Sequence, residues 1–145
     1  MGTKYDEIFL SFKDSITDPD LLSFSKDLQT EMLIALMDKA IAKCRHVCKT
    51  VDLSNRDDEL MEFFDKLPDD LVDIIIEWMT VFWLKPYLNN IENLRNNLST
   101  KDFSIFSPAN LLEKINNRYE SAKKYARSLT NEYSYRVGDM TRLKS

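Results

Sequence analysis

The scarcity of glycine and proline is the feature that most restricts how this chain can fold. Only 2 glycines and 4 prolines occur among its 145 residues, a length typical of one domain. Sandwiches and barrels of β-strands need many tight turns, and tight turns use these two residue types. Dinucleotide- and phosphate-binding loops need a cluster of glycines, which Gly2 and Gly138 cannot form. The sequence therefore predicts an all-α protein, a single compact bundle of four to five helices.

The first half of the chain contains two segments with helical periodicity. Over residues 4–15, apolar side chains recur at helical spacing, and Thr3 precedes them as the predicted N-cap. Ser25 is the predicted N-cap of a second helix over residues 26–48, which carries apolar side chains on more than one side. We expect the loop that follows to be anchored in the core by two aromatic side chains, Phe63 and Phe64.

Pro68 is predicted to start the central helix. Proline is favoured at the first helical position, and Asp69 and Asp70 follow in the first turn, where carboxylates are favourable. We expect this helix to carry the core through large side chains at helical spacing, Trp78, Phe82 and Trp83. Pro86 removes a hydrogen bond from any helix that contains it, so it predicts either a kink or a new helix that runs to about residue 98.

The last helix is predicted to start at Ser107-Pro108, an N-cap followed by a first-position proline, and to run to about residue 130 or further. Beyond this point the apolar period fades, and we expect Gly138 to interrupt the helix. The chain therefore divides into a helical bundle domain over residues 1–130 and a C-terminal tail or docking arm over residues 131–145. We expect this arm to bind a partner and to be weakly held in the free chain.

No catalytic constellation stands out, and we expect no enzyme activity, no cofactor and no metal site. His46, the only histidine, lies between Cys44 and Cys48. Neighbouring positions of a helix point about 100° apart, so His46 cannot easily act as a base for Cys44. We expect an exposed histidine and two reduced thiols. Acidic pairs such as Asp69-Asp70 lie where helix N-termini favour negative charge, which makes capping the preferred interpretation over acid–base chemistry.

Charge is unevenly distributed along the chain. Residues 1–73 contain 9 Lys and Arg against 17 Asp and Glu, a net charge of −8, whereas residues 74–145 contain 11 against 7, a net charge of +4. An acidic body with a basic C-terminal part can associate head to tail with copies of itself or bind an acidic partner. Salt-bridged helix faces that simply differ in composition would give the same asymmetry.

Two classes of partner are disfavoured by composition. The sequence pI of about 5.1 is far below that of typical nucleic-acid-binding domains, so we expect no sequence-specific nucleic-acid partner. No apolar run reaches the roughly 18 residues of a transmembrane helix, so we expect no membrane partner.

Tyrosine and arginine gather towards the C-terminus. Both residue types are enriched in protein interfaces, and the sequence offers them no obvious core to fill. We therefore predict a protein-interaction site formed by Arg127, Tyr133, Tyr135, Arg136, Arg142 and Lys144. A frayed C-terminus is the alternative interpretation of the same residues.

Several short sequence words occur between residues 5 and 138: Trp83-Leu84-Lys85-Pro86, Asn93-Leu94, Ser99-Thr100-Lys101-Asp102-Phe103, Ser107-Pro108-Ala109-Asn110-Leu111-Leu112 and Tyr133-Ser134-Tyr135-Arg136. In these words the chain resembles the head–tail connector (neck or adaptor) proteins of tailed bacteriophages. It differs from the better-known adaptors in Pro86 and in its acidic first half. The resemblance is compatible with the adaptor, a stopper-adjacent protein or another neck component.

The resemblance implies a structural function. Such connectors are non-enzymatic helical proteins that join the capsid portal to the tail as a ring, commonly of twelve copies, with the C-terminal segment reaching the portal. The implied partners are the portal protein and neighbouring neck or tail proteins, and the chain can be monomeric in solution. The implied location is the virion and, during assembly, the host cytoplasm. The alternative function is that of a small phage-encoded regulatory protein that binds a host protein.

Overall fold

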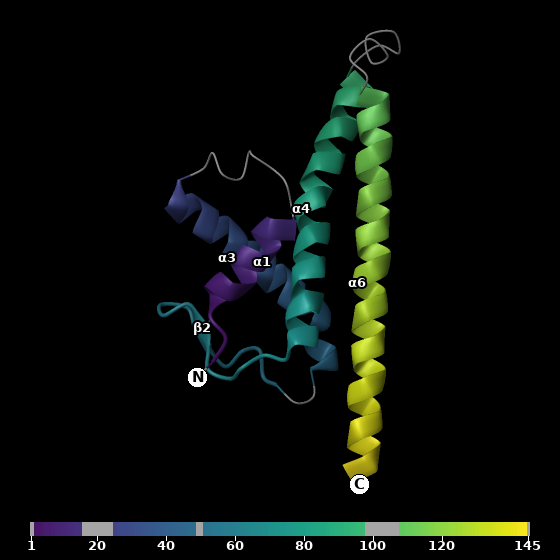
Figure 1. Ribbon diagram of the computed structural model, residues 1–145. Helices are drawn as coiled ribbons and strands as arrows, with labels where there is room; N and C mark the ends of the chain where they lie inside the picture. Colours follow the sequence, from purple (N-terminus) through teal and green to yellow (C-terminus); the bar gives the residue numbers. More distant parts are fainter. Residues whose placement is uncertain (1, 16–24, 49–50, 98–107, 145) are drawn as a thin grey trace.

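Figure 1 shows the computed structural model of the chain, which describes residues 2–15, 25–48, 51–97 and 108–144. Within these ranges, side chains are described except at 87–88, 90–97, 108–112 and 137–144. The described residues are mostly helical, which confirms the predicted all-α fold. The elements in chain order are α1 (Tyr5–Ser15), α3 (Lys26–Cys44), the 3₁₀ helix η1 (Arg45–Val47), β1 (Arg56–Asp57), β2 (Glu62–Phe63), α4 (Asp69–Asn97) and α6 (Pro108–Lys144).

Helix α4 is the central element. It forms a long antiparallel hairpin with α6, and α1 and α3 pack against its other side (Figure 1). The 37-residue α6 therefore contacts the rest of the molecule mainly through α4 and, to a much smaller extent, through η1. This arrangement leaves α6 at one side of the molecule, with the short strands at the other.

The core lies between α1, α3 and the first half of α4. Helix α1 buries the four side chains whose spacing predicted it, Tyr5, Ile8, Phe9 and Phe12. On α4, Trp78 and Trp83 are buried as expected, whereas Phe82 is half-buried. The ring of Trp83 meets that of Phe12 edge to face, with centroids 6.3 Å apart. Aromatic pairs in this geometry add to the stabilisation from burial.

Of the two N-cap predictions that fall on described residues, Ser25 is confirmed and Thr3 is wrong. The Ser25 hydroxyl accepts a hydrogen bond from the Leu28 backbone N–H at 3.3 Å, so it caps α3. The Thr3 hydroxyl instead accepts from the distant Leu67 N–H at 2.8 Å and is buried. The reason is that the chain before α1 is extended and pairs with the segment around β2, where the Phe63 N–H donates to the Thr3 carbonyl at 2.8 Å.

The loop expected after α3 contains a short β-hairpin that the sequence did not predict. β1 and β2 pair antiparallel, with Arg56 opposite Phe63, and Met61 in the connecting turn has a positive φ of 55°. Phe63 is buried as expected, but Phe64 is 51% exposed, which corrects its predicted core position. Neighbouring residues of an extended chain point to opposite sides, so both could not enter the same core.

Both long helices pass through residues that were expected to break them. Pro86 lies inside α4, which excludes a separate helix starting there. Helix α6 starts at Pro108 as predicted, but it continues across residue 130 and through Gly138 to Lys144, which corrects the expected break at this glycine. No change of secondary structure therefore marks the proposed boundary between residues 130 and 131. Ser107, the predicted N-cap, lies outside the described residues.

Candidate protein-interaction surfaces

The predicted interaction residues do not share one surface. Tyr133 is only 4% exposed and belongs to the core, which corrects its assignment to a free interface. Tyr135, two positions further along α6, is 75% exposed. Successive helix positions point in different directions, so α6 buries one of these tyrosines and presents the other to solvent. The side chains of Arg142 and Lys144 lie outside the described residues.

The two remaining arginines differ in their contacts. Arg136 Nη1 lies 2.6 Å from Asp70 Oδ2, in an ion pair between the end region of α6 and the first turn of α4. Both side chains are about half exposed, so this pair is worth little in stability but fixes the Arg136 guanidinium to its own chain. Arg127 is exposed on α6 and lines a shallow groove there.

The inward face of α6 is held by a buried polar contact. Trp78 Nε1–H donates to Thr130 Oγ1 at 3.0 Å, and the Thr130 hydroxyl donates to the Ala126 carbonyl at 2.7 Å. All three residues are buried. Every polar atom of this contact has a partner, so it positions α6 on α4 without the cost of an unsatisfied buried group.

The outward side of α6 carries a basic groove of about 290 Å³. It is lined by Lys123, Lys124 and Arg127, together with Glu120, Ser128 and Asn131. Within the described side chains, none of the three cations of this groove forms an ion pair. The Lys123 ammonium lies 5.8 Å from the centroid of the Tyr119 ring, a weak cation–π contact that leaves its charge without a carboxylate.

Residues 57–73 form an acidic segment, whose hairpin part with β2 lies on the side of the molecule away from α6 (Figure 1). It contains eight carboxylates, Asp57, Asp58, Glu59, Glu62, Asp65, Asp69, Asp70 and Asp73, against one lysine, Lys66. Crowding changes the titration of these groups. Burial, with the charges of Asp69 and Asp70, raises the pKa of Asp73. Burial, with the charge of Asp73, raises the pKa of Glu77 one helical turn later. Like charges on this surface therefore oppose one another.

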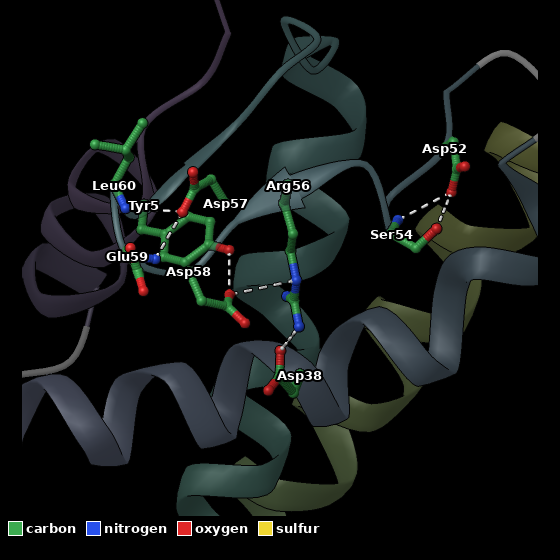
Figure 2. A network of polar contacts seen from close by, with 9 residues as sticks. All are labelled: Tyr5, Asp38, Asp52, Ser54, Arg56, Asp57, Asp58, Glu59 and Leu60. Atoms are coloured by element: carbon green, nitrogen blue, oxygen red, sulfur yellow. Dashed lines mark hydrogen bonds and ion pairs between the residues drawn. The ribbon is translucent and has the colours of Figure 1, made fainter.

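Arg56 organises the hairpin end of the acidic segment (Figure 2). Its Nη2 lies 2.7 Å from Asp38 Oδ1 on α3, and its Nε lies 3.6 Å from Asp58 Oδ1. The Tyr5 hydroxyl donates to the same Asp58 oxygen at 2.7 Å, and burial together with this bond raises the pKa of Tyr5. Burial alone would lower the pKa of Arg56, but the contact with Asp38, together with the charges of Tyr5 and Asp58, raises this pKa overall.

This network could not be predicted from the sequence, because its members come from separate elements. Asp38 lies on α3, Arg56 on β1 and Tyr5 at the start of α1. Only the packing of these elements brings the three side chains together. Two members of this network, Asp38 and Arg56, also line a cavity of about 830 Å³ between α3 and residues 51–56, together with Arg45 and Cys48.

The cysteines and the histidine lie near this cavity. His46 is exposed, as expected, in η1. Both cysteines are free thiols, and Cys48 Sγ–H donates to the Cys44 carbonyl at 3.3 Å. The interaction of the Cys44 thiol with the Cys48 side chain, together with burial, raises the pKa of the Cys44 thiol and so favours its protonated form.

The described residues contain neither a metal-binding cluster nor a helix able to span a membrane. Among them, no three or more His, Cys, Asp or Glu side chains are grouped as a metal ion would require. None of the helices that they form combines the length and apolar character needed to cross a bilayer. Comparison with known proteins gives no match, whether with protein families, with curated proteins or with solved structures.

Proposed function

We propose that the chain is a non-enzymatic structural protein of a tailed bacteriophage, one that joins the capsid portal to the tail through protein–protein contacts in a ring. The short sequence words of the connector family support this function, and such rings commonly contain twelve copies. The expected partners are the portal protein and the adjacent neck or tail proteins. The expected locations are the virion and, during assembly, the host cytoplasm.

The outward side of α6 is the observation that carries this proposal. This 37-residue helix packs on α4 with one face and exposes tyrosine and basic side chains on the other. Tyr125 is 54% exposed and Tyr135 is 75% exposed. Large, rigid aromatic side chains contribute much contact area at low entropic cost, and they dominate the binding energy of many interfaces. A long helix that presents them at the side of the molecule is suited to contact with a large partner.

Co-expression with the portal protein of the same genome tests this function. We expect the full chain to co-purify with the portal, and electron microscopy to show a ring of added density at the portal. Replacement of Tyr135 by serine should weaken this association at least about tenfold, because it removes an exposed aromatic anchor. The matched control is Leu10→Ser, which removes a side chain with 60% exposure from α1, away from the proposed contact.

Two outcomes would contradict the proposal. One is a chain that never co-purifies with the portal while both proteins are folded. The other is specific capture of a single host protein at fixed stoichiometry in place of the portal, which would favour the alternative of a small regulatory protein.

A further inference from the structure

The basic groove of α6 is an unpartnered helix surface with three cations. Lys124 and Arg127 are exposed and Lys123 is half-buried. In the described part of the chain none of them forms an ion pair with a carboxylate, although Glu120 lines the same groove. Like charges held on one surface repel, so a partner that supplies carboxylates would relieve this repulsion.

The hairpin end of the acidic segment offers carboxylates of this kind. Arg56 neutralises Asp58, and Asp57 is engaged in accepting hydrogen bonds from the backbone N–H groups of Glu59 and Leu60 at 2.8 and 3.1 Å. Glu59 and Asp65 are exposed and have no ion-pair partner among the described side chains. Figure 2 shows the Glu59 side chain directed away from Arg56.

This turn is ordered before it meets a partner. The two hydrogen bonds to Asp57 and the pairing of β1 with β2 fix the backbone that carries Glu59 and Leu60. Leu60 is 66% exposed at the same turn, so it adds an apolar side chain to the acidic surface. A preorganised turn loses little conformational entropy on binding, which favours association through this element.

The two charged surfaces lie on different sides of one molecule. In Figure 1 the hairpin with β2 lies at the far side of the body from α6, with α1, α3 and α4 between them. One chain therefore cannot join its own basic groove to its own hairpin turn. A contact between two copies through these surfaces is head to tail, and a head-to-tail contact repeats to form a ring or a filament.

We propose that the basic groove of α6 docks a second copy of this chain through the hairpin end of the acidic segment, where Glu59 and Leu60 lie in the turn between β1 and β2 and Asp65 lies just after β2. This inference rests on the proposed function, because it assigns the contact between neighbouring copies in the assembly. The Tyr135 region of α6 remains available for the portal, since the groove ends at Asn131.

Sedimentation velocity of the purified full chain, without portal, tests this contact. We expect concentration-dependent association at about 50 mM NaCl that is largely lost at about 500 mM, because exposed charge pairs are screened by salt. The double variant Lys124→Glu/Arg127→Glu should weaken association at least about tenfold, and so should Glu59→Lys/Asp65→Lys. Far-UV circular dichroism and thermal melting verify that each variant is folded.

Mixing the two charge-reversed variants makes the test specific. In the Lys124→Glu/Arg127→Glu variant the groove becomes acidic like the hairpin end, and in the Glu59→Lys/Asp65→Lys variant the hairpin end becomes basic like the groove. In an equimolar mixture, the acidic groove of the first variant can meet the basic hairpin end of the second. We expect association to return in the mixture. The matched control is Lys26→Glu/Lys39→Glu, which makes the same charge change at exposed positions of α3 and should leave association within about twofold of the parent.

The outcomes separate this inference from the proposed function. Three outcomes would each overturn the inference. The parent chain stays monomeric at both salt concentrations, the control weakens association as strongly as the groove variant Lys124→Glu/Arg127→Glu, or the mixture does not associate. If the groove variant also loses portal binding while the parent remains monomeric, the groove belongs to the portal contact. In that case the connector function stands and the copy-to-copy contact is wrong.

Discussion

Comparison of α1 with α6 shows that the length of a helix in this protein does not determine how many side chains it buries. Helix α1 has 11 residues and buries four large side chains. Helix α6 has 37 residues, yet among residues 113–136 only Ala126, Thr130 and Tyr133 are buried. The short helix therefore contributes mainly to the core, whereas the long helix contributes mainly surface.

The chemistry of the two contacts explains this difference. Tyr5 of α1 stacks at a tilt against Phe63 with ring centroids 5.1 Å apart, and Phe12 meets Trp83. Helix α6 instead buries two small side chains, Ala126 and Thr130, and one large one, Tyr133, among its described residues, with one buried hydrogen bond to α4. Small residues allow close approach but remove little apolar area from water. We therefore expect substitutions on α1 to cost more stability than most substitutions on α6.

The largest effect is expected in α1. Phe12→Ala removes a fully buried ring and should lower the free energy of unfolding by about 3–5 kcal/mol. Leu10→Ala, on the exposed side of the same helix, should change it by no more than about 0.5 kcal/mol. Urea denaturation measures both values. Equal effects of the two substitutions on the free energy of unfolding would contradict the conclusion that only one face of α1 contributes to the core.

Tyr133 and Tyr135 form a matched pair on α6, because the first is its large buried side chain and the second is exposed. Tyr133→Ala should cost about 3 kcal/mol because the ring is buried, whereas Tyr135→Ala should cost no more than about 0.5 kcal/mol. For the same reason, deletion of residues 131–145 should lower the melting temperature. A deletion variant as stable as the parent would instead restore the view of this segment as a free docking arm.

The buried hydrogen bond between α4 and α6 should have an intermediate effect. Thr130→Val keeps the shape of the side chain but leaves Trp78 Nε1–H without its acceptor, at a cost of about 1–3 kcal/mol. Thr130→Ser keeps the hydroxyl and should retain most of the stability. If valine and serine destabilise equally in chemical denaturation, the methyl group rather than the hydrogen bond holds α6 in place.

The exposed ion pair near the end of α6 should matter less. Arg136→Ala removes the contact with Asp70, and exposed pairs of this kind are worth less than about 1 kcal/mol. Thermal melts in low and high salt test this prediction. The difference in melting temperature between the variant and the parent should shrink as the salt concentration increases. A large loss that is insensitive to salt would show that Arg136 packs against α4 rather than merely pairing with Asp70.

The smallest effect concerns crowding of the carboxylates on α4. The pKa of Glu77 is raised above its ordinary value of 4.5, so folding disfavours its charged form. Stability from this residue is therefore lost as pH rises through the raised pKa and regained as pH falls. Glu77→Gln should raise the melting temperature slightly at pH 7, and the gain should vanish near pH 4. A gain that is the same at both pH values would exclude a titration effect.

Several features of this fold could be predicted from residues close together in the sequence. The spacing of Tyr5, Ile8, Phe9 and Phe12 identified α1, Ser25 identified the start of α3, and Pro108 identified the start of α6. These signals depend on helical periodicity and on capping, which operate within one or two turns. The basic character of α6 was also visible in the sequence, because charge does not depend on folding.

Tertiary structure decided where each of these side chains faces. Tyr133 and Tyr135 look alike in the sequence, but only the first meets α4, because the packing of α6 selects one side of the helix. Thr3 was expected to cap a helix and instead accepts a hydrogen bond from Leu67, which lies 64 residues away. Asp38, Arg56 and Tyr5 form one network from three elements. Sequence alone thus determined the helices and the charge of this protein, since both follow from local chemistry. Contacts between distant segments determined its surfaces, because they exist only after the helices have packed.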